Sequence, residues 1–386
     1  MVTSKEIIFA VPGSKVYISK YYNNRVNSFL NISLTGEKCE LMCSHCKARL
    51  LSDMVDINAT DFVLPDDPKP GENRVMEIIS RHQNKGGGFP VVADTDGKPK
   101  GGDPDSSTTV WCKAKDGAAR DSVSANDRIT ESESDKGGVL IGKKDKASVA
   151  EARQTSVKGI LISGGFDSLG RLPLDERILP ELKEVKNKYG REIKVFMHLG
   201  FTDRQTAESL CECGIDGVLV NIFSDKHAIE EIYNLKGCGP DMFYRNARLL
   251  KEFGLRVSPH LIIGLGAAGL SGEYHSVKEI AEAGADSCVF VIAKNTSGKD
   301  KPMLPEVKSL DVVKLFEYAK SIMPDIPVVL GCARPHGQEF EKMEIELLKL
   351  GIDVIAFPSE RTLDYAKDNN YSFHFEEQCC AFLINQ

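Results

Sequence analysis

Three cysteines stand close together near the start of the chain. Cys39, Cys43 and Cys46 are the first three cysteines of the sequence, and no fourth cysteine lies within the same loop. A closed zinc site takes four protein ligands. A [4Fe–4S] cluster held by three cysteines instead leaves one iron open to an outside ligand. The spacing therefore predicts a cluster-binding loop with one coordination position free.

Regular elements flank this cysteine loop. Residues 29–35 alternate between apolar and polar side chains and predict a strand, while residues 47–54 predict the start of a helix. Residues 1–28, which include Tyr17, Tyr21 and Tyr22, predict an N-terminal extension packed on the main body. We therefore expect the loop to lie at the carboxyl end of a strand.

A repeated strand–helix alternation fills the rest of the chain after about residue 150. Strands are predicted at 159–162, 193–199, 217–222, 256–263, 288–293, 326–331 and 353–357, and helices at 73–81, 175–189, 203–213, 240–253, 273–283, 309–322, 338–350 and 360–368. With the strand at 29–35 this makes eight units. They predict an α/β fold of the TIM type, a (β/α)8 barrel, whose active site lies at the carboxyl ends of the strands. An open doubly wound sheet is the alternative.

The domain boundaries follow from composition. Residues 84–150 are rich in glycine and polar side chains and predict an insertion after the first β–α unit, either a loose subdomain or partly disordered. The barrel then comprises 29–83 and 151–370. Residues 371–386 form a C-terminal tail that carries two adjacent cysteines.

Several conspicuous residues fall at the predicted strand ends. Ser163, Gly164 and Gly165 follow the second strand, and Asn221 ends the fourth. Glycines there allow a ligand to approach the backbone closely. Each feature also has an ordinary explanation: the glycine pair as a turn, Asn221 as a helix cap, and His260 on the fifth strand as a core histidine. Their common position on one rim favours a ligand site.

Composition limits the class of protein. The net charge of -7 gives no general electrostatic support for binding nucleic acid or an anionic membrane. No apolar run approaches the roughly 20 residues that span a bilayer, and the first residues lack a signal-peptide pattern. We therefore expect a cytoplasmic protein, in which eleven cysteines indicate thiol or metal chemistry rather than a disulfide framework.

The cysteine loop resembles the radical S-adenosylmethionine (SAM) superfamily, and the resemblance extends over residues 29–360 without the insertion. It implies that Cys39, Cys43 and Cys46 ligate a [4Fe–4S] cluster whose open iron binds SAM, and that cleavage of SAM yields a 5′-deoxyadenosyl radical. It also implies SAM contacts by His45, Ser163, Gly164, Gly165, Asn221, Ile262 and Gly264. Phe166 stands where the family usually carries an acidic residue.

A second set of cysteines lies far along the chain. Cys332 ends the seventh strand, and Cys379 and Cys380 stand near the C-terminus. We expect these three to hold an auxiliary Fe–S cluster, with Arg334 or Ser359 as a further ligand; free tail cysteines are the alternative. Three others, Cys211, Cys213 and Cys288, are expected to pack within helices or strands.

Within the superfamily, the chain resembles the biotin synthase-like enzymes and most closely the subunits of archaeal-type two-component lipoyl synthases. The stretches that carry this resemblance are 31–36, 46–51, 161–165, 331–335 and the terminal cysteine pair. It implies sulfur insertion into octanoyl-lysine on a carrier such as the glycine-cleavage H protein or an E2 lipoyl domain. It also implies a second synthase subunit and an electron donor such as ferredoxin or flavodoxin.

Two other interpretations remain open from the sequence. One is a radical SAM mutase or lyase similar to methylornithine synthase, which has no auxiliary cluster. The other is a structural protein that binds an Fe–S cluster or zinc and catalyses nothing.

Overall fold

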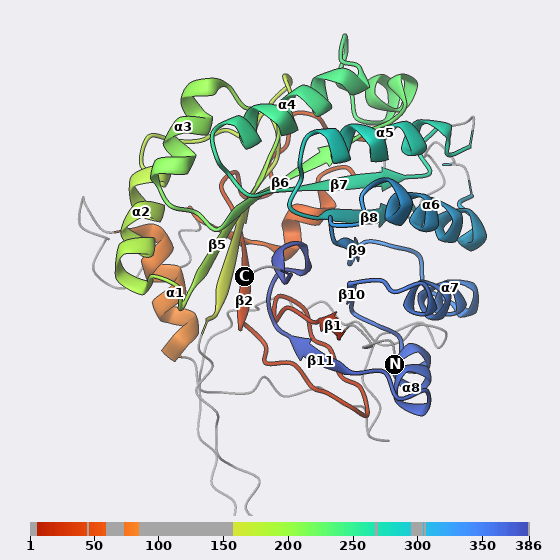
Figure 1. Ribbon diagram of the computed structural model, residues 1–386. Helices are drawn as coiled ribbons and strands as arrows, with labels where there is room; N and C mark the ends of the chain where they lie inside the picture. Colours follow the sequence, from red (N-terminus) through yellow and green to blue (C-terminus); the bar gives the residue numbers. More distant parts are fainter. Residues whose placement is uncertain are drawn as a thin grey trace, which may run out of the picture.

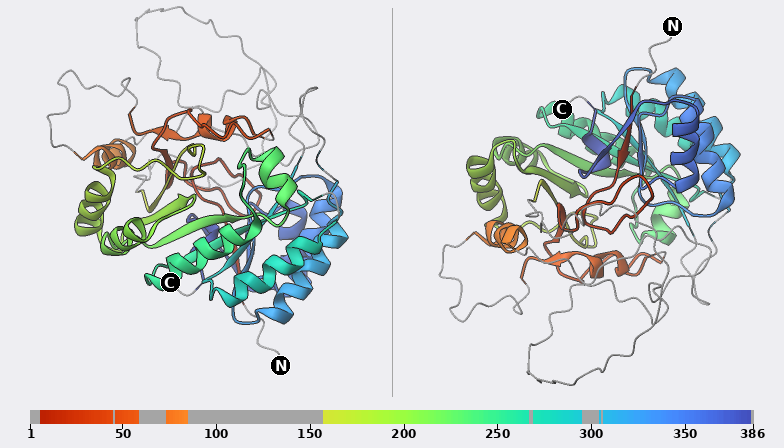
Figure 2. Two further views of the ribbon diagram at one scale, coloured as in Figure 1. Left: turned by 90° about the horizontal axis from the view of Figure 1, so that it is seen from above. Right: turned by 90° about the horizontal axis from the view of Figure 1, so that it is seen from below.

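Parallel strands form the centre of the molecule. The computed structural model describes residues 6–44, 46–58, 73–84, 157–266, 269–294, 304 and 306–384. Eleven strands make one sheet in the order β11-β1-β10-β9-β8-β7-β6-β5-β4-β2-β3, and every pairing is parallel. The sheet curves into a half-barrel with the helices along its outer side (Figure 1, Figure 2). This arrangement is consistent with a TIM-type barrel.

All eight predicted strands are present. They are β2 (Phe29–Ser33), β4 (Gly159–Ser163), β5 (Lys194–Leu199), β6 (Gly217–Ile222), β7 (Val257–Ile263), β8 (Cys288–Ile292), β9 (Val328–Leu330) and β10 (Val354–Ala356). The predicted helices are α1 (Arg74–Asn84), α2 (Ile178–Tyr189), α3 (Arg204–Glu212), α4 (Pro240–Glu252), α5 (Ser271–Glu282), α6 (Ser309–Ile322), α7 (Gln338–Lys349) and α8 (Glu360–Asp368). The alternation read from the sequence is thus confirmed.

Three further strands are present that the sequence did not predict. They are β1 (Ile7–Ala10), β3 (Val55–Asp56) and β11 (Phe373–Glu376). All four residues of β1 are buried, and the strand lies between β10 and β11. Part of the predicted extension and part of the predicted tail therefore belong to the sheet itself. Among the described residues β3 and β11 end the sheet and do not pair with each other.

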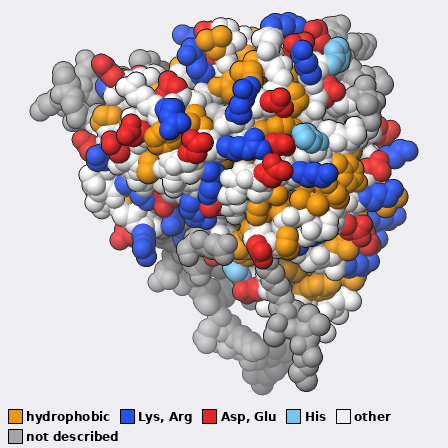
Figure 3. All heavy atoms as spheres, turned by 45° about the horizontal axis from the view of Figure 1, so that its top comes forward, with side chains coloured by type: hydrophobic (Ala, Val, Ile, Leu, Met, Phe, Trp, Pro, Cys, Tyr) orange, Lys and Arg blue, Asp and Glu red, His pale blue; other side chains and the backbone are white. Residues whose placement is uncertain are grey.

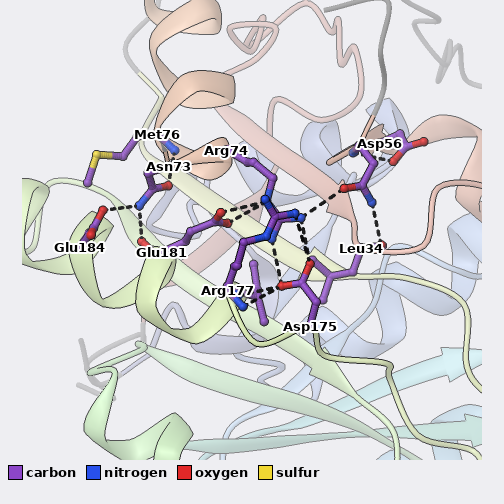
Figure 4. Close-up of polar contacts among 11 residues, drawn as sticks. Leu34, Asp56, Asn73, Arg74, Met76, Asp175, Arg177, Glu181 and Glu184 are labelled. Carbon is purple, nitrogen blue, oxygen red and sulfur yellow. Dashed lines mark hydrogen bonds and ion pairs between the residues drawn. The ribbon is translucent and has the colours of Figure 1, made fainter. Parts of the chain in front are cut away.

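A polar cluster fastens the first helix to the second. Arg74 at the start of α1 donates through Nε to Glu181 on α2 at 2.9 Å and forms an ion pair with Asp175 at 2.9 Å (Figure 4). Its Nη1 also donates to Asn58, which follows β3, at 3.2 Å. The residues beyond Asn84 in the predicted 84–150 insertion lie outside the described part of the chain.

The C-terminal segment closes the amino ends of the strands. Gln378 donates to the Lys158 carbonyl at 3.0 Å, and the Ser287 hydroxyl donates to the Ala381 carbonyl. Phe382 stacks on Phe196 with ring centroids 5.1 Å apart. Lys158 and Ser287 directly precede β4 and β8, so the tail covers the end of the sheet opposite the cysteine loop.

The exterior shows no single dominant charge on the face in Figure 3, where acidic and basic side chains are interspersed. In the described part of the chain, no helix combines the length and apolar character needed to cross a membrane.

Candidate functional site

A cavity of about 390 Å³ opens at the carboxyl ends of β2, β4, β5 and β6. Its wall brings together most of the residues that the sequence predicts for a site. They are Cys39, Cys43, Cys46, Ser163, Gly164, Gly165, Asn221 and Cys332. Residues more than 290 positions apart in the chain thus share one cavity, because parallel strands present all their carboxyl ends on one rim.

The cysteine loop is held by two neighbouring loops. On one side the Glu40 amide donates to the Phe166 carbonyl at 2.9 Å, just after β4. On the other side the Ser44 amide donates to the Ile232 carbonyl at 2.8 Å, in the short π-helix η3 (Ala228–Ile232) after β6. These backbone bonds anchor the loop at Glu40 and at Ser44.

Gly165 permits the close approach of the β4 loop to the cysteine loop. A Cβ atom at this position would lie 2.6 Å from the Cα atom of Cys39 and would also collide with the Lys38 carbonyl oxygen. The Gly165 amide donates to the Thr35 hydroxyl at 2.7 Å. A side chain at residue 165 would therefore displace the start of the cysteine loop.

The three cysteines of the loop form an environment that favours a bound cation. The pKa of Cys43 is raised, first by a hydrogen bond with the Cys46 side chain, then by burial and by the charges of Cys46 and Cys39. Three thiolates so close together repel one another, and a bound cation relieves that repulsion. Among the residues that the structure describes, which do not include His45, no group of three or more His, Cys, Asp or Glu side chains is arranged around a metal position. The donor set fits a metal cluster in kind and number, without being preformed.

Other predicted site residues lie away from the cavity wall. Ile262 is buried within β7, and Gly264, with a φ of 87°, donates its amide to Glu273 at 2.9 Å. Neither belongs to the cavity lining. His45 lies outside the described residues.

The second cysteine set is divided between two places. Cys332 is exposed and lines the cavity, whereas Cys379 and Cys380 are buried in the C-terminal segment and do not line it. The pKa of Cys380 is raised well above its ordinary value by a hydrogen bond with Cys379 and by burial, and Cys332 makes a smaller contribution in the same direction. Cys332 thus influences the pKa of Cys380 but lines the cavity, which Cys379 and Cys380 do not.

The two suggested non-thiolate ligands have other partners. The Arg334 guanidinium makes five hydrogen bonds, to Glu344 and to the carbonyls of Gly331, Ala356 and Phe357. Ser359 caps α8 through the Thr362 amide at 3.2 Å. Both side chains are therefore hydrogen-bonded to other protein groups in this structure, and the further ligand of an auxiliary cluster stays a prediction. Among the remaining cysteines, Cys213 and Cys288 are buried as predicted, but Cys211 is exposed.

Some cavity residues were not predicted. Lys15 comes from the N-terminal segment, Lys294 follows β8, and His198 points inward from β5. No local pattern marks Lys15 or Lys294 as site residues, because only the folded sheet brings their loops to the rim. His198 is not among the predicted ligand contacts, but it stands at the end of the strand predicted at 193–199, so the sequence places it on the same rim.

Comparison with known proteins gives limited guidance. No family model matches the chain, and no curated protein matches it. Similar solved structures include the [FeFe]-hydrogenase maturase HydG from Carboxydothermus hydrogenoformans, with 14% identity, TM-score 0.43 and coverage of 58% of each chain. Methylornithine synthase (PylB) has 13% identity, TM-score 0.39 and coverage of 52% of this chain and 57% of its own.

A third similar structure is Streptococcus suis SuiB bound to S-adenosylmethionine, with 14% identity, TM-score 0.43 and coverage of 85% of this chain and 57% of its own. The alignments thus span less than two thirds of each of these three proteins. Likeness at this level carries no argument about chemistry, so the function is argued below from the residues of this chain.

Proposed function

We propose that the protein is a radical SAM enzyme. The observation that carries the proposal is the position of Cys39, Cys43 and Cys46 on one wall of a cavity at the carboxyl ends of parallel strands. These three side chains would hold a [4Fe–4S] cluster and leave one iron open. When bound, the cluster and SAM supply an adenosyl radical that abstracts a hydrogen atom from an unactivated carbon.

The protein's own residues would place and shield the reactants. Gly165 lets the β4 loop lie against the cysteine loop, and Gly164 and Gly165 both line the cavity, where the lack of a side chain would allow a cofactor to approach the backbone closely. Phe166, Phe223 and Tyr233 line the same cavity and limit the entry of water. Asn221 offers a side-chain amide to the ribose or carboxylate of SAM.

The narrower proposal is sulfur insertion into octanoyl-lysine by a lipoyl synthase subunit. Its support is the exposed Cys332 thiol on the cavity wall, together with the contribution of Cys332 to the raised pKa of Cys380. In this proposal Cys332, Cys379 and Cys380 would hold an auxiliary cluster that supplies sulfur. The H protein or an E2 lipoyl domain would deliver the octanoyl chain. A second subunit and a ferredoxin or flavodoxin would complete the system.

A second candidate is a mutase or lyase with one cluster. It is favoured by the burial of Cys379 and Cys380 away from the cavity lining. Iron content after anaerobic reconstitution separates the two candidates, because two clusters give about eight irons per chain and one gives about four.

The decisive experiment is anaerobic incubation with SAM, a reductant and an octanoylated carrier, with and without the partner subunit. Formation of 5′-deoxyadenosine supports the radical SAM proposal, and its absence from a fully loaded protein contradicts it. A gain of sulfur mass on the carrier supports the narrower proposal. Replacing Cys379 and Cys380 by alanine should then stop sulfur transfer but preserve SAM cleavage; unchanged sulfur transfer would remove the pair from the mechanism.

A further inference from the structure

We propose that Asn234 is a positioning residue, which holds the cysteine loop in the shape that brings its thiols to the cavity wall. The proposal deepens the proposed function and rests on it for the role of the loop. Asn234 follows the short helix η3, far from the cysteine loop in the sequence. Its side-chain Nδ2 donates to the Leu41 carbonyl oxygen at 2.6 Å. Leu41 stands between Cys39 and Cys43, so this bond holds the middle of the loop.

Asn234 belongs to a run of three consecutive residues that all contact the cysteine loop. The Ile232 carbonyl accepts from the Ser44 amide at 2.8 Å, and the Tyr233 carbonyl accepts from the Cys43 thiol at 3.7 Å. These two residues contribute backbone carbonyls, whereas Asn234 contributes a side-chain donor. A substitution at residue 234 therefore removes one contact and leaves the carbonyls of the other two in the chain.

The run is itself fixed to strand β6. Phe223 directly follows the strand, and its ring centroid lies 4.0 Å from that of Tyr233. Both aromatic side chains are buried. The Tyr233 amide donates to the Ala228 carbonyl in η3 at 3.1 Å. Asn234 thus reaches the cysteine loop from a packed segment, which is what a residue that positions another element requires.

The bond to Leu41 acts next to an unfavourable backbone conformation. Met42 has a φ of 41°, in the left-handed region that residues with a side chain rarely adopt. Its side chain is exposed, so burial there does not offset the strain. Backbone strain of this kind persists where neighbouring contacts over-determine it. The Leu41 carbonyl belongs to the peptide group that precedes Met42, so the Asn234 amide holds one side of the strained turn.

The first measurement uses the metal-free full-length protein. Hydrogen–deuterium exchange of the Ser44 amide reports how often the loop separates from η3. Asn234 has a φ of 55°, which glycine and aspartate both tolerate. Asn234→Gly removes the donor, and Asn234→Asp keeps the shape of the side chain but cannot donate. We expect each variant to speed Ser44 exchange about fivefold, the value of one hydrogen bond of about 1 kcal/mol.

Two control variants separate this local effect from others. Asn370→Gly alters an exposed asparagine that also has a left-handed backbone, with a φ of 58°. Asp203→Ala removes the side-chain cap of α3, which accepts from the Thr206 amide at 2.8 Å, and should lower the free energy of unfolding by a similar amount. We expect both controls to leave Ser44 exchange unchanged.

The second measurement follows the reconstituted protein. We expect both Asn234 variants to take up less iron per chain than the unmodified protein. The electron paramagnetic resonance signal of their reduced cluster should also change, because that signal depends on the arrangement of the ligands. The two control variants should give the signal of the unmodified protein, since a general loss of stability does not alter the arrangement of the cysteines.

Three results would overturn the proposal. Unchanged Ser44 exchange in either Asn234 variant would show that the side-chain donor does not hold the loop. Equal acceleration in Asp203→Ala would show that the Ser44 amide responds to general destabilisation. Faster exchange with unchanged iron uptake and an unchanged resonance signal would show that the bond does not position the cysteines. Absence of 5′-deoxyadenosine from the fully loaded, unmodified protein would instead count against the proposed function alone, because the exchange is measured without the cluster.

Discussion

Arg334 and Glu344 form a buried ion pair, with 2.7 Å between Nη2 and Oε1 and side chains only 1% and 5% exposed. Glu344 stands on α7 and also accepts from the Ser359 amide and the Thr362 hydroxyl. Arg334 bonds the carbonyls that end β9 and β10. The pair therefore ties the Cys332 loop to α7 and α8.

Replacing Arg334 by an uncharged residue should destabilise the protein strongly. Arg334→Met leaves the Glu344 carboxylate buried and unpaired, and loss of one partner of a buried pair costs about 3–5 kcal/mol. Urea unfolding measures the free energy of unfolding. Arg204→Met is the control, because its ion pair with Glu252 is 71% and 60% exposed and should contribute under about 1 kcal/mol. Equal losses in the two variants would contradict a structural role for the Arg334 pair.

Cys43→Ala should prevent the reconstituted protein from holding its cluster at the cysteine loop, because one of three thiolate ligands is lost. We expect SAM cleavage to fall below detection and the iron content to drop. Cys211→Ala changes an exposed cysteine on α3 and should retain both. SAM cleavage that survives in Cys43→Ala would disprove the site assignment.

Gly165→Ala should lower iron incorporation, because the added methyl group would collide with the backbone of Lys38 and Cys39. The expected readout is a reduced iron-to-protein ratio after reconstitution. Gly239→Ala is the control, since a Cβ there meets no described atom within 4 Å. Normal iron content in Gly165→Ala would show that the two loops can separate without loss of the site.

Acid should destabilise the metal-free protein partly through His260. The folded pKa of about 3 is below the unfolded value of about 6.5, so between these values only the unfolded state binds the proton. The contribution to stability is therefore complete above about pH 6.5 and is lost as pH falls toward 3. Between about pH 7.5 and 5.5 the wild type should lose about 1.4 kcal/mol more than His260→Asn.

Urea unfolding at the two pH values provides the test of that difference. His275→Asn should follow the wild type, because its histidine is largely exposed. An equal loss of stability in His260→Asn and in the wild type would contradict this prediction. It would mean that the His260 ring takes up a proton in the folded protein as it does in the unfolded one.

Local patterns determined much of the fold. The apolar runs of four to eight residues between amphipathic helices indicated seven of the eight strands, because strands covered on both faces are largely apolar. The CxxxCxxC spacing by itself indicated a cluster loop, since ligand type and spacing lie within one short segment. Strand β3, with only two residues, offered no comparable pattern.

Only the tertiary structure decided which distant residues meet. It placed Cys332 on the cavity wall and buried Cys379 and Cys380 in the C-terminal segment, away from that wall, although the sequence grouped the three. It also paired Arg334 with Glu344 in a buried ion pair and placed His260 opposite Asn221 in the register of β6 and β7. These relationships depend on strand order and register, which are set by packing across the whole sheet and are not encoded in any single stretch of the chain.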